Sequence, residues 1–226
     1  MNASKRGAGE TAPVLAYRVD YAKGEFQGFG FAGVHGKAAN LRSLDPNDTS
    51  VAGVNPVSGD AYSTRDTTLN LFEFDAYFIR GDWTVQGQLS FGQQKNAAIT
   101  ADPVTGDLRD AQWYGLSTLV AYKFEPRLEG TARFDYLYNR KNGGGLLGYT
   151  ALDDRNGIGY ANGGDTERGV NRQALTLGLS YLFNLNTTFK VEYRHDRASG
   201  PVFLDVQSQE YRKSNNLLAT SVLVQF

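Results

Sequence analysis

The sequence ends in Asn-Asn-Leu-Leu-Ala-Thr-Ser-Val-Leu-Val-Gln-Phe, residues 215–226, and the character of these residues alternates along the stretch. Successive side chains of a β-strand point to opposite faces. Leu218, Val222 and Phe226 therefore share an apolar face, and Gln225 lies on the other. Chain ends usually fray unless an element ties them down, so a strand that ends on an aromatic residue is unusual. The stretch predicts a β-strand that runs to the last residue.

The same alternation returns along the rest of the chain, and it predicts about nine strands in all. Residues 26–38 are rich in glycine, and their facing stays open because Phe29 and Phe31 oppose Phe26. The eight stretches that precede the last strand are 13–22, 26–38, 67–80, 83–94, 111–124, 128–140, 172–183 and 189–196.

The connections between these stretches alternate between short and long. Transmembrane barrels have short periplasmic turns and longer extracellular loops, whereas a soluble sandwich mixes lengths less regularly. We therefore predict one domain over residues 1–226, an antiparallel up-and-down transmembrane β-barrel with 1–12 as a flexible lead-in. Residues 197–214 are either a loop or an extended hairpin in which 202–206 continue as strand. The short connections are 22–26, 80–82, 125–127 and 184–186, and the long ones are 41–66, 100–110, 141–170 and 197–214.

Composition narrows the class further. The mean hydropathy is −0.42, and no run approaches the ~18 apolar residues of a membrane helix. Cysteine is absent, which excludes a disulfide framework and a thiolate metal site. The net charge of −1 gives no support for a nucleic-acid partner. We predict neither a cofactor nor a metal.

The polar face of the predicted strands carries charges of both signs. In a membrane barrel the apolar face meets lipid and the polar face lines the lumen. Aromatic residues gather near the predicted strand ends, as the two interfacial girdles of a barrel require. The predicted pore lining is Arg18, Asp20, Glu73, Asp75, Gln86, Gln88, Glu129, Arg133, Asp135, Lys190, Glu192, Arg194 and Asp196.

Two sequence patterns resemble known functional sites. Residues 28–33 match the glycine fingerprint of dinucleotide-binding proteins, but residues 34–40 lack the helical period that the fingerprint requires. Glycines that make room for large neighbours in a strand are the better interpretation. His195-Asp196, with Asp153-Asp154 as partners, would suit an outer-membrane enzyme of omptin or phospholipase type at the extracellular rim. Adjacent strand residues point to opposite faces, so we expect no enzyme.

The terminal strand, the loop alternation and the charged inner face resemble the outer-membrane porins of Gram-negative proteobacteria. In that family the last strand closes the barrel and carries the assembly signal, here Val222, Val224 and Phe226. The resemblance implies passive diffusion of small hydrophilic solutes and ions across the outer membrane, often through homotrimers. Membrane lipid and lipopolysaccharide are the implied surroundings. The resemblance also implies a loop folded into the pore, for which 141–170 is the candidate, although the general-porin constriction signature is not recognisable there.

Strand number leads to one more expectation. An ordinary bacterial barrel has an even number of strands and both termini in the periplasm. Nine strands that end in the periplasm begin outside the cell, and the first residues lack a signal-peptide pattern. We therefore expect this chain to be the C-terminal part of a larger barrel, of about 12–18 strands. A miscounted strand in 41–66 or 141–170 is the rival explanation.

Overall fold

The computed structural model describes residues 13–38, 54–55, 57–60, 62, 67–97, 102, 104–141 and 170–225. Over these residues the chain forms one nine-stranded sheet and one two-stranded sheet, and the all-β antiparallel prediction is confirmed. Among the described residues, no helix is long and apolar enough to cross a membrane. The strands are β1 (Leu15–Ala22), β2 (Gln27–Ala38), β3 (Thr67–Arg80), β4 (Trp83–Gln94), β5 (Ala111–Glu125), β6 (Leu128–Lys141), β7 (Arg172–Asn184), β8 (Thr187–Ala198), β9 (Phe203–Asp205), β10 (Glu210–Arg212) and β11 (Ser214–Val224).

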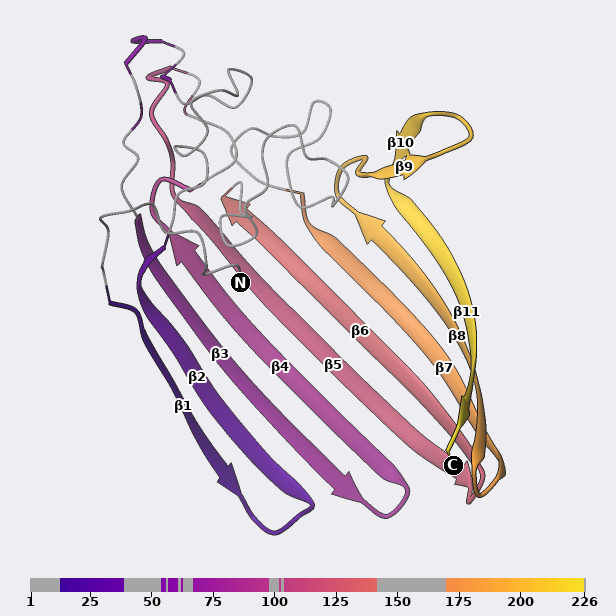
Figure 1. Ribbon diagram of the computed structural model, residues 1–226. Coiled ribbons are helices and arrows are strands. Elements are labelled where there is room, and N and C mark those ends of the chain that lie inside the picture. The colour runs from indigo at the N-terminus through magenta and orange to yellow at the C-terminus, as the bar shows by residue number, and fades with distance from the viewer. Residues whose placement is uncertain are drawn as a thin grey trace.

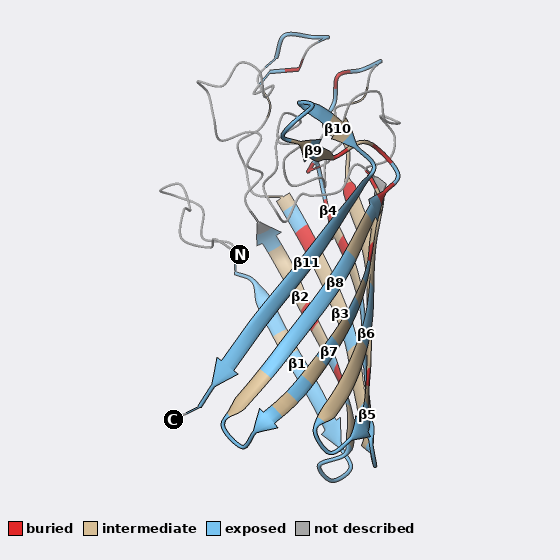
Figure 2. Ribbon diagram, turned by 90° about the vertical axis from the view of Figure 1, so that its right-hand side faces the viewer, coloured by how far each residue is buried: buried red, intermediate tan, exposed pale blue. Residues whose placement is uncertain are grey.

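The large sheet is a curved wall with two open edges. Its strands follow the order of the chain, β1 to β8 and then β11, and β1 and β11 are the edges. Figure 2 shows the curvature, with the two edge strands on one side and β5 and β6 on the other. In Figure 1 the short turns lie together at the bottom, and the strand ends that lead into the long connections lie together at the top, as predicted. Both β1 and β11 run towards the short turns, so the two edges are parallel to each other.

The glycine-rich stretch is strand β2, as the steric interpretation predicted. It is followed by no helix and pairs with β1 and β3 along its length. A Cβ at Gly28 would lie 2.8 Å from the ring of Tyr77, and a Cβ at Gly30 would collide with the guanidinium of Arg18. These two glycines therefore leave the space through which long side chains of β1 and β3 cross over β2.

The pairing also settles the facing of β2. Phe29 lies opposite Ala76 and Phe31 lies opposite Phe74, so these aromatic rings share the outward face of β3. Phe26 precedes the strand. The aromatic rings of Phe29 and Phe74 lie 6.1 Å apart.

Residues 197–214 contain a hairpin, which is one of the two predicted alternatives, but its strands do not join the large sheet. Phe203–Asp205 pair with Glu210–Arg212 in a hairpin of their own, outside the large sheet. The carboxylate of Asp205 accepts the Gln207 N–H at 3.0 Å, which closes a tight turn that directs the chain back to β11. The hairpin is anchored by a small apolar cluster that contains the buried side chains of Val170, Ala198 and Val202.

Two of the long connections carry the same turn. Asn55 begins Asn-Pro-Val-Ser-Gly-Asp, and Asp102 begins Asp-Pro-Val-Thr-Gly-Asp. In each turn the first side chain accepts the N–H groups of the third and fourth residues at 2.8 and 3.0 Å. In the second turn the hydrogen bonds from these backbone N–H groups lower the pKa of Asp102. The bond from Thr105 has the larger effect, and the bond from Val104 has the smaller one. The fifth residue is a glycine with φ of +78° or +73°, a conformation that glycine adopts without strain.

These two turns are joined to each other. The amide of Asn55 donates to the Thr105 carbonyl at 3.1 Å and to the Asp107 carboxylate at 3.3 Å. The Tyr62 hydroxyl donates to the Gly106 carbonyl. The Asn55 side chain is almost completely buried in this contact, so the long connections after β2 and β4 are fixed to one another above the sheet.

Candidate functional site

Charged side chains of the large sheet gather on its concave face. Residues directly opposite in a ladder share a face. One continuous row across the sheet therefore places four carboxylates together with an amide and a hydroxyl. The row is Asp20, Gly30, Asp75, Gln88, Ser117, Asp135, Ala174 and Asp196.

The remaining residues of the predicted lining lie on the same face, in neighbouring rows. Each is joined to the others by the same ladder pairing, since alternate residues of a strand return to one face. They are Arg18, Glu73, Gln86, Glu129, Arg133, Lys190, Glu192 and Arg194. The ladder thus brings the whole predicted set onto one surface.

Arg18 holds the acidic cluster at the β1 edge of this face. Its guanidinium crosses over Gly30 and donates to both carboxylate oxygens of Asp75, at 2.8 and 3.0 Å. It also forms an ion pair of 2.7 Å with Asp20 and a longer one of 3.8 Å with Glu73. Three carboxylates therefore share one guanidinium, and the β1–β3 side of the face carries an excess of negative charge.

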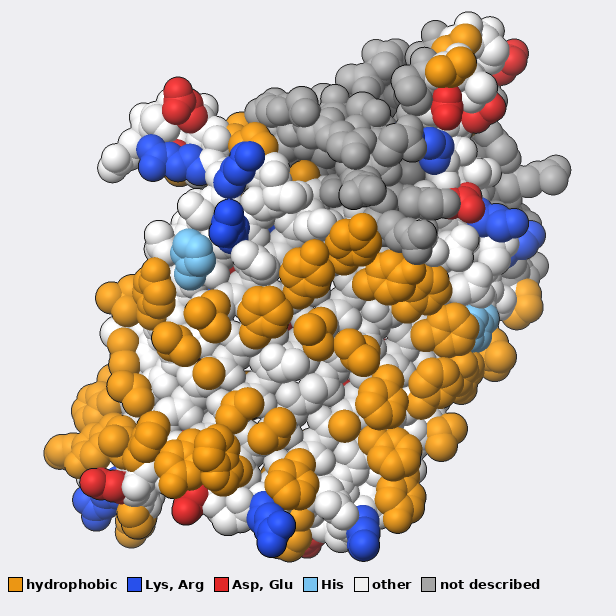
Figure 3. All heavy atoms as spheres, turned by 180° about the vertical axis from the view of Figure 1, so that it is seen from behind, with side chains coloured by type: hydrophobic (Ala, Val, Ile, Leu, Met, Phe, Trp, Pro, Cys, Tyr) orange, Lys and Arg blue, Asp and Glu red, His pale blue; other side chains and the backbone are white. Residues whose placement is uncertain are grey.

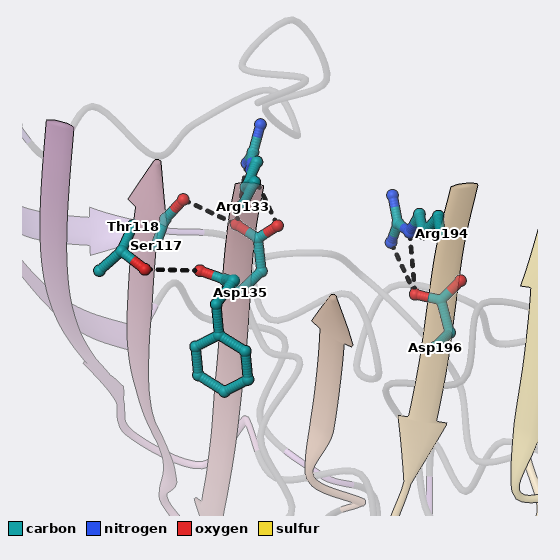
Figure 4. A network of polar contacts seen from close by, with 7 residues as sticks. Ser117, Thr118, Arg133, Asp135, Arg194 and Asp196 are labelled. Carbon is teal, nitrogen blue, oxygen red and sulfur yellow. Dashed lines mark hydrogen bonds and ion pairs between the residues drawn. The ribbon is translucent and has the colours of Figure 1, made fainter. Parts of the chain in front are cut away.

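The β6–β8 side of the face repeats a simpler arrangement, shown in Figure 4. Arg133 donates to Asp135 two residues along β6, at 2.9 Å, and Asp135 also accepts the Ser117 hydroxyl at 2.7 Å. Arg194 donates to Asp196 on β8 at 2.8 Å. Exposed pairs of this kind stabilise a fold by only ~0–1 kcal/mol. Their main effect is to reduce the net charge of the face, because the arginine and the aspartate of each pair together present a polar and nearly neutral surface.

Two adjoining hollows lie over these groups. One of about 440 Å³ is lined by Arg18, Asp75 and Arg133, and the other, of about 300 Å³, by Asp135, Arg194 and Asp196 among others. Gln88 and Ser117 line both hollows. The concave face can therefore hold water and small polar solutes along a continuous track.

Ser117 belongs to this track but was not among the predicted lining residues. Strand alternation contained the signal, because Ser117 follows Leu116, which lies opposite the outward residue Leu89. A lone serine in an apolar strand attracts no attention by residue type, although strand alternation would have placed it with the charged set.

The convex face is apolar. Figure 3 shows hydrophobic side chains over its middle, with charged side chains above and below. Leu89, Leu177 and Leu218 are 53%, 50% and 69% exposed there. No outward position within the described part of the nine strands carries Asp or Glu between the strand ends. A soluble protein does not leave so large an apolar surface in water.

Aromatic rings border this apolar face at two heights. Phe72, Phe91 and Tyr114 follow one another towards the long connections, with centroids 6.3 and 5.1 Å apart. Trp83 and Tyr122 contact near the short turns at 4.5 Å. Phe91 and Trp83 are eight residues apart on β4, which is about 27 Å along a strand and ~20 Å in height at the usual tilt. The spacing fits the apolar layer of a membrane.

The two histidines do not join the concave site. His195 and Asp196 point to opposite faces, as expected, and the His195 ring bonds Asn216 at 2.8 Å on the outward side. His35 faces outward as well. It lies opposite Asn70 of β3, and Asn70 shares the outward face with Phe72, two residues further along the strand. Asp153-Asp154 and Phe226 lie outside the described residues, and so do residues 142–169 of the predicted pore loop. Of the predicted assembly residues, Val222 lies opposite Phe189 and Val224 opposite Thr187.

A tilted antiparallel sheet with an apolar convex face, two aromatic borders and a charged concave face is the wall of an outer-membrane β-barrel. The chain belongs to DUF3138, a family described as proteins of unknown function, whose family model matches residues 3–226. No curated protein matches the sequence.

Several solved structures are similar to the chain. OmpT, an outer membrane protein of Vibrio cholerae, is 14% identical with a TM-score of 0.48, over 93% of this chain and 53% of that one. The toluene transporter TodX of Pseudomonas putida is 11% identical with a TM-score of 0.40, over 95% and 61%. The NanC porin is 10% identical with a TM-score of 0.41, over 95% and 94%. The chain thus spans about half the length of OmpT.

Proposed function

We propose that this chain forms the wall of a porin, a water-filled channel through which small hydrophilic solutes and ions diffuse passively. The observation that supports it is the separation of charge between the two faces. Asp20, Glu73, Asp75, Glu129, Asp135, Glu192 and Asp196 all face inward. Burying an ionised carboxylate in lipid is costly, whereas water in a lumen hydrates it.

The pairing of these charges favours weak ion selectivity. Arg133 and Arg194 each lie within 3.0 Å of a carboxylate on their own strand, so most of the wall has little net charge. The surplus of carboxylates around Arg18 adds a mild preference for cations. Solutes would therefore be selected mainly by size and polarity.

A channel also requires a closed wall. Because β1 and β11 run in the same direction, direct pairing of these edges would be parallel. We propose that further strands, odd in number, join them in a wall that is antiparallel throughout. Unpaired strand edges in lipid would leave backbone groups without partners, at several kcal/mol each. Assembly of closed barrels into homotrimers, as the porin resemblance implies, is part of this proposal.

Conductance across a planar lipid bilayer tests the proposal. We expect the protein, refolded as a closed barrel that includes these further strands, to give stepwise, ohmic conductance, and liposomes that contain it to swell in small sugars. The control is boiled protein, which should give neither signal. Protein that inserts into liposomes, resists protease and shifts its gel mobility on heating, yet passes neither ions nor sugars, would refute the porin assignment.

A further inference from the structure

Two lysines lie on the outward face, close to the end with the long connections. Lys37 of β2 pairs with Thr68 of β3, and the Lys95 N–H donates to the Thr68 carbonyl at 2.9 Å. The lysines therefore flank Thr68 on neighbouring strands, with backbones about 10 Å apart at ~4.8 Å per strand. Both side chains are exposed. Figure 3 shows Lys and Arg side chains above the hydrophobic surface.

A layer of hydrogen-bonding side chains lies just below the lysines. His35, Asn70 and Gln93 are consecutive in the ladder and share the outward face. The His35 Nδ1–H donates to the Asn70 amide oxygen at 3.0 Å, and its Nε2 accepts the Tyr17 hydroxyl at 3.3 Å. This polar layer is two residues tall, or about 7 Å along the strands.

Below the polar layer the surface becomes aromatic and then aliphatic. Phe72 and Phe91 are the next outward residues, and the His35 ring lies 4.7 Å from the Phe72 ring. One acid lies close to the lysines on the described part of this surface. It is Asp110, which precedes β5 beside Lys95 and accepts the Asn96 N–H at 3.1 Å. Two ammonium groups therefore face one carboxylate, and this carboxylate already accepts a hydrogen bond from a backbone N–H group.

We propose that this stepped surface binds a phosphorylated glycolipid of the outer leaflet, with the chemistry of lipid A. Lys37 and Lys95 bind its phosphates, and His35, Asn70 and Gln93 hydrogen-bond its sugars. The acyl chains lie against the aromatic and aliphatic residues below. The inference rests on the proposed orientation of the wall, with the long connections outside the cell. A phospholipid fits less well, because it has no sugar to occupy the polar layer.

Native mass spectrometry of the detergent-purified chain with added lipid A tests this inference. We expect one lipid A to remain bound at activation energies that strip phosphatidylglycerol. The variant Lys37→Gln/Lys95→Gln should lower the affinity about 25-fold, since each lysine beside an anionic surface contributes about fivefold. Arg80→Gln is the matched control, because Arg80 is an exposed cation on the same face at the opposite end of β3. It should bind lipid A as the unmodified protein does.

Three results would overturn the glycolipid site. These are equal binding by the double lysine variant, an equal loss in Arg80→Gln, or equal binding of phosphatidylglycerol and lipid A. Dephosphorylated lipid A should bind about as weakly as the double variant does, and tight binding of it would contradict the role of the lysines. Conductance of the double variant separates this inference from the porin proposal. Normal conductance with unchanged lipid A binding refutes the site alone, whereas lipid A binding without conductance refutes the channel alone.

Discussion

Placing a charge on the apolar face at Val191 tests the facing of the whole sheet. Val191 lies opposite Leu179 of β7 and Thr220 of β11, and 39% of it is exposed on the convex side. The neighbouring residue Glu192 faces the lumen opposite Ala219. We expect Val191→Arg to destabilise the protein in a membrane and Ala219→Arg to be tolerated. The second substitution places a guanidinium in water beside a carboxylate.

The position of Val191 sets the size of the effect. It is four residues from Thr187, the first residue of β8. Four residues at ~3.4 Å and a tilt of ~40° place it about 10 Å above the short turn. The apolar band of a barrel is ~25 Å tall, so Val191 lies within a few ångströms of the midplane. Arginine there costs about 2–4 kcal/mol.

Urea unfolding in lipid vesicles measures this cost, with the fluorescence of Trp83 and Trp113 as the signal. At a slope of about 2 kcal/mol per molar urea, Val191→Arg should lower the midpoint by about 1–2 M. Ala219→Arg should shift the midpoint by less than about 0.3 M, since solvated substitutions usually cost under 0.5 kcal/mol. The opposite outcome, a harmless Val191→Arg and a destabilising Ala219→Arg, would mean that the inner and outer faces have been exchanged.

Three further outcomes follow from the inner face and the loops. Arg194→Glu should shift the reversal potential in a salt gradient towards cations and leave urea unfolding nearly unchanged; an unchanged potential would place Arg194 outside the conducting path. Gly30→Val should displace Arg18 and cost about 1–3 kcal/mol of unfolding free energy, whereas Gly87→Val, which has open space around its Cβ, should cost little. Hydrogen bonds from two backbone N–H groups lower the pKa of Asp102, so its turn should be fully stabilised above the ordinary aspartate pKa of about 3.9 and loosen as the pH falls through the lowered value. Amide protection of the two donors as a function of pH checks this sign.

The fold was readable from the sequence because strand alternation is a strong, local signal. A period of two over eight or more residues located eight long strands before the last one, and the connection lengths gave their order. The signal was weak at 203–212, where it left a loop and a hairpin as alternatives, because three-residue strands are too short to show a period. It was also ambiguous at Phe29 and Phe31, where glycines removed the polar partners that normally mark the other face.

The candidate site was predictable as a face but not as a set of contacts. Alternation placed Arg133 and Asp135 together, since residues two apart on a strand share a side. It gave no indication that Arg18 reaches Asp75, because that ion pair joins residues 57 positions apart across an intervening strand. The joined turns at Asn55 and Asp102 show the opposite case. Their hexapeptides are alike in the sequence, but only the structure reveals that one turn binds the other.

The strict division of carboxylates between the faces also limits how this protein can change over generations. Deleting one residue within a strand sends every later side chain of that strand to the other face. One codon lost early in β3 would turn Glu73 and Asp75 towards lipid and Phe72 and Phe74 towards water. Strands should therefore vary by substitution, or gain and lose residues in pairs, while the long connections tolerate insertions of any length. Descendants of this gene are expected to differ most in what they show to the outside of the cell.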